Sequence, residues 1–391
     1  MMKDLKVHAR NVDEQTMDQI RAITSHPAVD GPVSIMPDCH VGAGCVIGFT
    51  GRFRDAVIPN VVGVDIGCGV MLSPMDGVDR GNARFGDLDS HIRKVVPLGP
   101  NHHGGRSVFD RFGGRFPRRA GRMEELAGLA DDFYGRILRN RTSAPALTQL
   151  GTLGSGNHFV EVDEDGDGHL FLSVHTGSRN FGYQVAGYFQ DMARSFLRGS
   201  GLGEGIPQGL EYLPMDRGGR DYMKWLAVAQ EFAEHNRFMI LDSVLGFYGL
   251  KPDMASITDS VHNYISDRDG IVRKGAISAR NGEKVVIPLS MSSGIVRGTG
   301  RGNPAYNCSA PHGAGRLFGR KEMKRRLSDG DISMEMFQRS MKGIFSTSVC
   351  SATIDESPMA YRNWEDIQEE VAETVDVSAI LRPVYNLKAA G

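Results

Sequence analysis

Short clusters that contain glycine interrupt this chain along its whole length and separate brief apolar runs. Four of them are GVDIGCG (63–69), LGSGNH (153–158), HTGSRNFG (175–182) and HGAGR (312–316). Glycine allows tight turns and lets the backbone approach a ligand or a neighbouring strand closely. A turn-rich β protein would account for many of these glycines. The polar and ionisable residues inside the clusters indicate, in addition, that several turns line a site.

The apolar patterns between the clusters predict a mixed α/β fold. Residues 11–25 and 219–249 have helical spacing, whereas residues 33–72 form short apolar runs typical of strands. Residues 158–174 read as a β-hairpin around an acidic, glycine-bearing turn. We find neither a long linker nor an internal repeat, and therefore expect one α+β domain over residues 1–391. Further helices are expected within 80–145, 316–331 and 363–375, and strands at 270–279, at 284–291 and in the C-terminal tail.

Several features predict a soluble cytoplasmic protein. The first residues lack the apolar stretch of a secretory signal, and no uncharged apolar run reaches about 18 residues, the length needed to span a membrane. Five cysteines are too few for a disulfide framework in a chain of 391 residues, which favours reduced thiols. The net charge of −2 still permits nucleic-acid binding if positive charge is gathered locally.

Imidazole, thiolate and carboxylate groups recur at the ends of the predicted strands. Imidazole and thiolate suit borderline transition metals, and carboxylate also accommodates manganese or magnesium. Taken singly, each residue is more often structural; a lone cysteine, for example, packs like a small hydrophobic residue. The repetition of this chemistry indicates a metal site. The residues concerned are Asp65, Cys68, His158, His175, His262 and His312.

Two other motifs are not binding sites by this reading. Asp163, Asp165 and Asp167 imitate the start of a calcium loop, but the twelfth position is Val174, where a bidentate glutamate is required. We interpret this segment as a solvated hairpin turn. The glycines of RGTGRGN (297–303) lack the GK[ST] sequence of a Walker phosphate loop.

Seven motifs occur in a fixed order along the chain. They are PDCHVGAG (37–44), VVGVDIGCG (61–69), LGSGNHFVE (153–161), VHTGSRNFG (174–182), VHNYI (261–265), RKGAISA (273–279) and SAPHGAGR (309–316). Together they resemble the RtcB family of GTP-dependent RNA-splicing ligases, and the resemblance extends from about residue 30 to Lys388. Such a series is far more specific than any one motif.

The resemblance implies two Mn²⁺ ions and a covalent histidine intermediate. Cys68 would bridge the ions, with Asp65 and His158 completing one coordination shell and His175 and His262 the other. His312 would attack the α-phosphate of GTP and carry GMP. The GMP would then pass to an RNA 3′-phosphate, formed where necessary from a 2′,3′-cyclic phosphate, and an RNA 5′-hydroxyl would expel it. Broken tRNA or rRNA ends are the implied substrates, and some relatives use an archease-type activator.

The same resemblance implies the residues that contact the guanylate. Arg179 would hold the RNA terminal phosphate and Arg316 a nucleotide phosphate, although either arginine could instead form a surface ion pair. The implied guanylate contacts are Asn157, His158, Phe159, Val160, Glu161, His262, Asn263, Pro288, Leu289, Ser290, Met291, Ser293, His312, Gly313, Ala314, Gly315 and Lys388.

Two basic clusters favour RNA binding independently of the resemblance. Nine arginines between residues 106 and 141 alternate with Phe109, Phe112 and Phe116, and a second cluster spans residues 316–326. Basic side chains bind phosphates, and aromatic rings can stack on unpaired bases. Either cluster could equally be a solvated charged face.

The sequence departs from the family pattern beside the expected guanine pocket. Leu289 stands where glycine is usual, the segment 288–293 is two residues shorter, and SAPHGAGR lacks the usual cysteine before the histidine. These changes suggest a divergent branch, and we hypothesise that it repairs cleaved tRNA or rRNA rather than splicing introns. Two alternatives remain open: a metal-dependent RNA cyclic phosphodiesterase that does not ligate, and a non-catalytic RNA-binding protein of the same fold.

Overall fold

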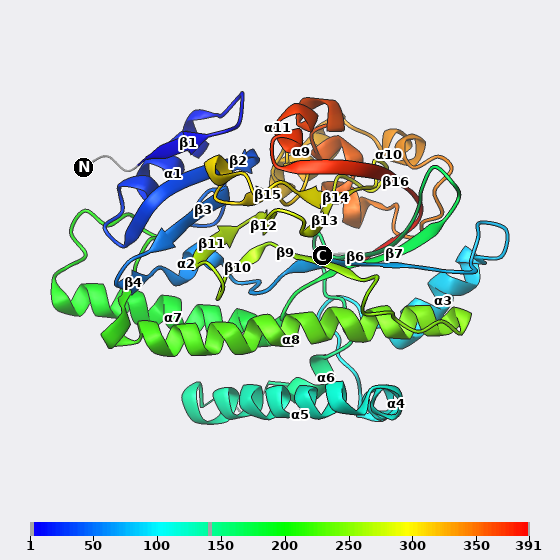
Figure 1. The fold of residues 1–391 in the computed structure, drawn as a ribbon, viewed down its shortest axis with the longest axis horizontal. Coiled ribbons are helices and arrows are strands. Elements are labelled where there is room, and N and C mark those ends of the chain that lie inside the picture. Colours follow the sequence, from blue (N-terminus) through cyan, green and yellow to red (C-terminus); the bar gives the residue numbers. More distant parts are fainter. Residues whose placement is uncertain (1–3, 140–142, 390–391) are drawn as a thin grey trace.

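A computed structural model describes residues 4–139 and 143–389 of the chain. Strands lie above two long helices, and a smaller helical layer lies below them (Figure 1). The long helices are α7 (Arg179–Ser200) and α8 (Gly219–Leu245). The lower layer consists of α4 (Ser107–Arg115), α5 (Pro117–Asp132) and α6 (Ala146–Gln149).

The larger sheet has seven strands in the order β13-β14-β16-β6-β7-β5-β9, all paired antiparallel. Its central hairpin, β6 and β7, confirms the hairpin predicted from the sequence. Because the order differs from the order along the chain, this sheet brings distant motifs together. Its strands are β5 (Gly69–Pro74), β6 (Phe159–Glu164), β7 (Leu170–Thr176), β9 (Thr258–Val261), β13 (Lys284–Pro288), β14 (Ile295–Gly300) and β16 (Val375–Lys388).

A second sheet has the order β1-β2-β3-β11-β10, in which only β1 and β2 pair parallel. β12-β15 and β4-β8 form two small two-stranded ribbons. The strands are β1 (Leu5–Val7), β2 (Val29–His40), β3 (Ile47–Phe53), β4 (Ala56–Val57), β8 (Leu213–Pro214), β10 (Asn263–Ile265), β11 (Ile271–Lys274), β12 (Ala276–Ser278) and β15 (Ser309–Pro311).

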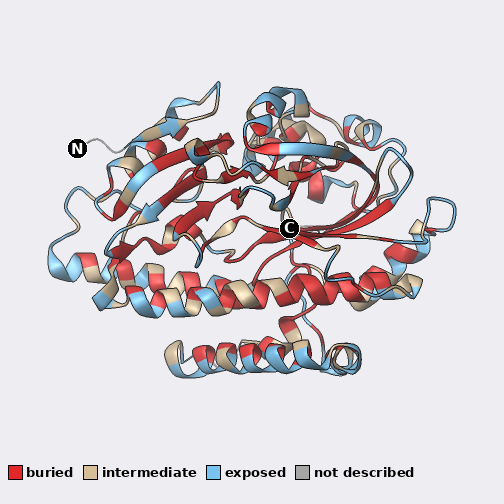
Figure 2. Cartoon of the chain, viewed as in Figure 1, coloured by how far each residue is buried: buried red, intermediate tan, exposed pale blue. Residues whose placement is uncertain are grey.

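The core is built around α8, whose residues are buried along much of its length (Figure 2). This helix packs against α7, α5 and the strands β5 and β7, so apolar residues are needed on several of its faces. A separate apolar cluster, including Ile277, Ile287 and Ala310, lies behind the ribbon β12-β15. The remaining helices are α1 (Glu14–Ser25), α2 (Pro59–Val62), α3 (Phe85–Val95), α9 (Arg320–Asp329), α10 (Met334–Ser340) and α11 (Gln368–Ala372).

The predicted α+β class is confirmed, and the structure corrects two local expectations. The helix expected near 363–375 is reduced to a 3₁₀ turn at Trp364–Asp366 and the short α11, because β16 already begins at Val375. Asp163, expected in a solvated turn, is fully buried within β6. Among the residues that the structure describes, no helix combines the length and apolar character required to cross a membrane.

Candidate active site

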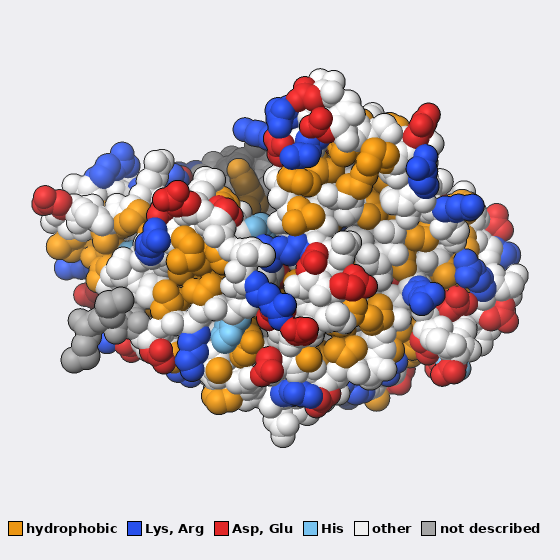
Figure 3. All heavy atoms as spheres, turned by 90° about the horizontal axis from the view of Figure 1, so that it is seen from above, with side chains coloured by type: hydrophobic (Ala, Val, Ile, Leu, Met, Phe, Trp, Pro, Cys, Tyr) orange, Lys and Arg blue, Asp and Glu red, His pale blue; other side chains and the backbone are white. Residues whose placement is uncertain are grey.

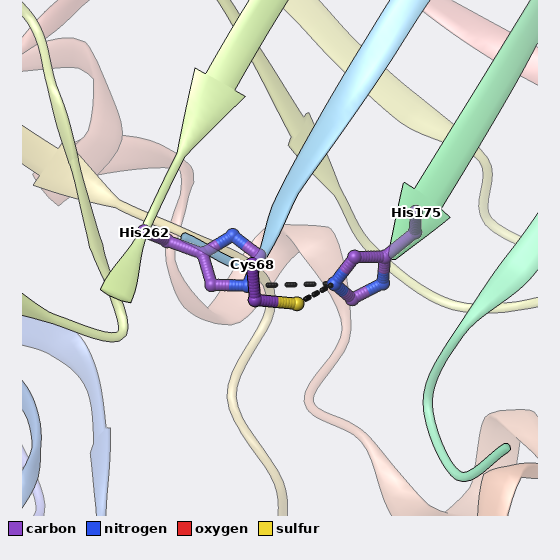
Figure 4. Close-up of side chains that lie close together, drawn as sticks. All are labelled: Cys68, His175 and His262. Carbon is purple, nitrogen blue, oxygen red and sulfur yellow. Dashed lines mark hydrogen bonds between the residues drawn. The ribbon is translucent and has the colours of Figure 1, made fainter. Parts of the chain in front are cut away.

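The predicted metal ligands converge at one end of the seven-stranded sheet. Cys68 directly precedes β5, His175 lies near the end of β7, and His262 follows β9. Because β7, β5 and β9 are adjacent in the sheet, these three side chains meet although they are far apart in sequence. The Cys68 Sγ lies 3.2 Å from the His175 Nε2, which lies 3.4 Å from the His262 Nε2 (Figure 4).

A second group of donors shares Cys68. The Asp65 Oδ2 lies 2.9 Å from the His158 Nε2, and the Cys68 Sγ lies 3.5 Å from the same nitrogen. The His158 Nδ1 lies 2.9 Å from the Leu153 carbonyl oxygen, which is an acceptor, so the Nε2 keeps its lone pair for a cation. Within each group all ligand atoms lie within 4.8 Å of one another. Two metal ions bridged by Cys68 would fit this arrangement.

Glycines hold the Asp65–Cys68 turn against its neighbours. A Cβ on Gly177 would lie 2.0 Å from the Asp65 carboxylate. Gly67 has a φ of +70°, in the left-handed region, and a Cβ there would meet α8 at 2.9 Å. The His262 N–H donates to the Cys68 carbonyl over 2.9 Å, which fixes the two ligand-bearing segments relative to each other. These contacts explain the glycine-rich motif around Cys68.

The electrostatics of the donors are compatible with a bound cation. Burial, assisted by the Asp65 charge, raises the pKa of the Cys68 thiol well above its ordinary value. Burial and neighbouring histidines lower the pKa values of His175 and His262 well below theirs. Two neutral imidazoles and a thiol therefore face one another, and a bound metal ion would supply the charge that stabilises the thiolate.

A buried ion pair contacts the backbone next to two of the candidate metal ligands. Arg237 is fully buried, makes two 2.8 Å contacts with the carboxylate of Asp259, and donates to the carbonyl oxygens of Gly67 and Thr176. These carbonyls adjoin Cys68 and His175 in the chain. The pair thus fixes the backbone of two ligand-bearing segments.

We expect Asp259→Ala to lower the free energy of unfolding by about 3–5 kcal/mol, because it leaves the Arg237 charge buried without its partner. Urea unfolding measures this change. Asp376→Ala, which removes an exposed partner of Arg301, is the matched control and should cost less than about 1 kcal/mol. Equal losses in the two variants would contradict the structural role assigned to the buried pair.

His312 lies directly after β15 and faces the metal-ligand groups. Its ring centroid is 5.0 Å from that of His262. The Asp38 Oδ2 accepts a hydrogen bond from the His312 Nδ1 over 2.7 Å, and Asp38 is completely buried in β2. This tautomer leaves the lone pair on Nε2 available to attack an electrophile. Asp38 lies within the motif PDCHVGAG, yet we did not single it out from the sequence because 274 residues separate it from His312.

One cavity of about 330 Å³ connects His312 with the donor residues, a size within the range of ligand pockets. Most of the predicted guanylate contacts line it, but His158, Val160 and Ser293 do not. Val160 packs into the main core, and the Ser293 hydroxyl contacts that of Ser290 at 2.9 Å. The predicted lining residues are Asn157, Phe159, Glu161, His262, Asn263, Pro288, Leu289, Ser290, Met291, His312, Gly313, Ala314, Gly315 and Lys388.

Three cations converge at one wall of this cavity. The Glu356 carboxylate lies 3.3 Å from Lys388, 3.2 Å from Arg316 and 3.3 Å from Arg320. Arg320 also lies 4.0 Å from the Asp355 carboxylate, so three positive charges face two carboxylates, and the remaining positive charge suits this wall to a phosphate-bearing ligand. We did not identify Glu356 from the sequence, since an isolated glutamate carries no motif.

The guanidinium of Arg316 is already surrounded by protein acceptors. It contacts the Phe318 and Asp355 carbonyls, the Glu356 carboxylate and the Tyr361 hydroxyl. In this arrangement the Arg316 guanidinium has no pair of N–H groups free to bind a nucleotide phosphate. Phosphate binding by Arg316 therefore stays a prediction. The contacts observed for Arg316 hold the residues that form this wall of the cavity.

The divergent segment 288–293 forms the apolar side of the cavity. Leu289 packs into the cluster behind β12-β15, and Met291 into a cluster with Met323 and Phe337. The Leu289 N–H donates to the Gly294 carbonyl over 2.8 Å, which closes the shortened loop. Leucine in place of glycine therefore adds core packing here rather than leaving a gap.

A buried acidic pair adjoins the cavity. Glu161 accepts a hydrogen bond from Asn386, and the Asp163 Oδ2 accepts one from Ser173 over 3.3 Å. Burial raises the pKa of Glu161 to about 7 and raises that of Asp163 well above its ordinary value, with the Glu161 charge contributing. The two carboxyl groups therefore retain a shared proton near neutral pH.

We expect Asp163→Asn to reduce the dependence of stability on pH. A carboxyl group whose pKa is higher in the folded than in the unfolded state stabilises the fold fully at a pH below its unfolded-state pKa of about 4–4.5. This stabilisation is lost as the pH rises through about 7, the folded-state pKa of Glu161. Urea unfolding at pH 5.5 and pH 8 should show the wild type losing about 1–3 kcal/mol more than the variant. Asp167→Asn, at the exposed tip of the hairpin, is the control. Equal losses in wild type and Asp163→Asn would refute this linkage.

Arg179 lies at the start of α7, close to the metal-ligand groups. It donates to the Thr152 hydroxyl over 2.9 Å and to the Gly99 carbonyl over 2.8 Å. A Cβ on Gly154 would lie 2.0 Å from the guanidinium and 2.8 Å from the His158 ring, so both groups border the same glycine. The structure thus places Arg179 beside the Asp65–Cys68–His158 group, whereas Arg316 lines the cavity that contains His312.

The basic clusters differ from the sequence-based expectation. Phe109 and Phe112 are buried in the core, so the prediction that these rings stack on bases is wrong. Arg106, Arg115 and Arg122 pair with carboxylates. On the face seen in Figure 3, basic and acidic side chains are interspersed rather than forming one positive field. Arg141 lies outside the described residues.

Comparison with known proteins agrees with the geometry. The family model for tRNA-splicing ligase RtcB matches residues 19–389. The RNA-splicing ligase RtcB of Escherichia coli K12 is 29% identical over 96% of this chain and 95% of its own length. The tRNA-splicing ligase RtcB of Archaeoglobus fulgidus is 27% identical over 97% and 91%, and the RNA-splicing ligase RtcB of Mycobacterium tuberculosis is 27% identical over 95% and 99%. The chain therefore belongs to the RtcB family.

Proposed function

We propose that this protein is a GTP-dependent RNA ligase that joins RNA 3′-phosphate or 2′,3′-cyclic phosphate ends to 5′-hydroxyl ends, with residues 1–391 as a single ligase domain. Relatives that match nearly the whole chain are named RNA-splicing ligases. The observation that carries the proposal is His312, oriented by Asp38 and facing the metal-ligand groups across one cavity.

His312 is the nucleophile of the first step. Its Nε2 attacks the α-phosphorus of GTP, a nitrogen–phosphorus bond forms, and the bond to the pyrophosphate oxygen breaks. The Nδ1–H stays hydrogen-bonded to Asp38, whose carboxylate stabilises the positive charge that develops on the imidazole. Asp38 is therefore a positioning residue for this step.

The cavity walls bind the two halves of the nucleotide differently. Lys388, Arg316 and Arg320 supply positive charge on one wall. Glu161 and Asn386 offer polar groups, and the Phe159 ring lies 5.2 Å from the Lys388 ammonium. We assign Glu161, Asn386 and Phe159 to the guanine base and Arg316 and Arg320 to phosphate, with Lys388 between them because it contacts both Phe159 and Glu356.

Asp65, Cys68, His158, His175 and His262 would hold two Mn²⁺ ions, which supply charge neutralisation at the reacting phosphates when bound.

In the second step the RNA 3′-phosphate oxygen attacks the phosphorus of the GMP on His312 and releases the imidazole. In the third step an RNA 5′-hydroxyl oxygen attacks the activated 3′-phosphate, and GMP leaves with the electrons of the broken phosphorus–oxygen bond. Arg179 would orient the 3′-phosphate beside the Asp65–Cys68–His158 group.

A joining assay tests the proposal. Purified protein is incubated with Mn²⁺, GTP and two RNA fragments, one ending in a 3′-phosphate and one beginning with a 5′-hydroxyl. A joined product that requires both Mn²⁺ and GTP is expected, and a fragment ending in a 3′-hydroxyl is the control. Opening of a 2′,3′-cyclic phosphate without joining, under any metal and nucleotide condition, would instead support the cyclic phosphodiesterase. RNA binding without either reaction would support the non-catalytic RNA-binding protein.

A further inference from the structure

The reaction proposed above gives no role to Asp163, although this carboxyl group adjoins a residue of the cavity wall. Side chains two residues apart on a strand point to the same face, so Asp163 lies beside Glu161 on β6. Glu161 lines the cavity that contains His312, whereas Asp163 is fully buried and does not line it. Asp163 can therefore act on a ligand in this cavity only through Glu161.

The surroundings of Asp163 favour its neutral form. Among the described residues, the groups that act on its charge are the Glu161 carboxyl and the Ser173 hydroxyl, which donates to the Asp163 Oδ2 over 3.3 Å, and neither is a cation. No donor of the described structure reaches the other oxygen, Oδ1. A buried carboxylate without a cation is costly, whereas a protonated carboxyl group needs only an acceptor for its O–H. Oδ1 is therefore free to carry a proton.

Glu161 lies in a different environment, which favours its ionised form more. The Asn386 side-chain amide donates to the Glu161 Oε2, and the Lys388 ammonium attracts its negative charge. Both residues belong to β16, which pairs with β6. Burial raises the pKa of both carboxyl groups, while the hydrogen bond between them acts to lower that of Glu161 and to raise that of Asp163. Of the two groups, Asp163 is the one that retains the shared proton.

We infer that Asp163 determines the base specificity of the nucleotide site, because it keeps the shared proton and donates a hydrogen bond to the Glu161 carboxylate. This inference rests on the proposed function and names a residue that would select its nucleotide. Guanine carries two donors on one edge, the N1–H and the 2-amino group, which match the two oxygens of a carboxylate. A protonated Glu161 would instead direct its own O–H toward these donors. Selection of guanine thus depends on which carboxyl group holds the proton.

Asp163→Leu tests the inference because it removes the donor with little change in side-chain size. Guanylylation of His312 is measured at pH 8, above the pKa of about 7 of Glu161, with GTP and with inosine triphosphate, which lacks the 2-amino group. The wild type should use GTP about 10–100-fold more efficiently, as expected for one hydrogen bond to a charged group. In Asp163→Leu this preference should fall to about threefold or less through a higher KM for GTP, with kcat and the KM for RNA unchanged.

Asp163→Asn separates hydrogen-bond donation from packing. Its amide nitrogen can donate to Glu161 from the same position, so the preference for GTP should stay within about threefold of the wild-type value. Asp167→Leu makes the same change as Asp163→Leu at the exposed tip of the hairpin and is the matched control. A merely structural role for Asp163 would reduce guanylylation with both nucleotides equally. An unchanged preference in Asp163→Leu, or an equal loss in Asp163→Asn, overturns the inference and leaves the proposed function intact.

Infrared spectroscopy locates the proton without turnover and uses only conservative variants. Protonated carboxyl groups absorb apart from carboxylates, so difference spectra at pH 8 between the wild type and each variant identify the group that carries the proton. The band is expected to disappear in Asp163→Asn and to persist in Glu161→Gln. Retention of the band in Asp163→Asn, or its loss in Glu161→Gln, overturns the inference.

Direct nucleotide binding distinguishes failure of the inference from failure of the proposed function. Binding of GDP and inosine diphosphate is measured by calorimetry in the wild type and in Asp163→Leu. A preference for GDP that Asp163→Leu abolishes, in a protein that neither takes up GMP nor ligates, supports the inference and overturns the proposed function. Ligation by a wild type that binds both nucleotides equally overturns the inference alone.

Discussion

His312→Ala is expected to lose covalent labelling by α-labelled GTP by at least about 1,000-fold, because the variant lacks the imidazole nitrogen that we propose attacks the α-phosphorus. Labelling is measured by incubating protein with Mn²⁺ and α-labelled GTP, denaturing it and counting protein-bound radioactivity. A phosphorus–nitrogen bond is labile to acid and stable to alkali, so the wild-type label should be lost on acid treatment. RNA joining should fall in parallel.

Measuring the Mn²⁺ content of His312→Ala shows whether the variant has lost only the proposed nucleophile or also the ability to bind metal. His312 is absent from both metal-ligand groups of the described structure, so the variant should retain its Mn²⁺. His169→Ala changes an exposed histidine in the β6–β7 hairpin and should label like the wild type. Persistence of the acid-labile label in His312→Ala would refute the assignment of this residue as nucleophile.

Cys68→Ala is expected to weaken both metal sites at once. Cys68 belongs to both donor groups, whereas every other donor belongs to one. Loss of a shared ligand should lower Mn²⁺ affinity by more than about 100-fold, beyond the effect of removing a supporting group outside the coordination shell. Equilibrium dialysis measures the number of bound ions. Substitution with Co²⁺ adds a spectroscopic check, since thiolate-to-cobalt absorption should appear in the wild type and vanish in the variant.

Comparison with an unrelated cysteine makes this test specific. Cys350 is exposed and belongs to neither donor group of the described structure, so Cys350→Ala should bind two ions and ligate normally. His175→Ala should weaken one site more than the other because it leaves the Asp65–Cys68–His158 group complete. If Cys68→Ala bound both ions with unchanged affinity, the bridging arrangement would be wrong.

The sequence alone determined the main elements and the chemistry of the donors. Helical spacing predicted α1 and α8, and the alternation around residues 158–174 predicted the β6–β7 hairpin, because these patterns depend on local periodicity. The ordered motifs also indicated the family that the comparison shows. The candidate metal donors were recognisable because their residue types limit what a turn can bind.

Tertiary structure decided which side chains meet. Asp38 reaches His312 across 274 residues, and Glu356 gathers Lys388, Arg316 and Arg320 from separate segments. Neither contact leaves a local signal, because it depends on strand order and register. A shift of one residue in register turns every side chain of a strand to the opposite face.

The same reason explains the mistaken expectation for the arginine-rich region. Phe109 and Phe112 alternate with arginines in the sequence, which resembles a surface that stacks on bases, but α4 turns both rings inward against the core. Conversely, Gln149 has no motif, yet folding leaves its Oε1 buried without a partner beside Arg179. The sequence determined which chemical groups the chain carries, whereas only packing between distant elements decided which of them are buried, paired or left to bind a ligand.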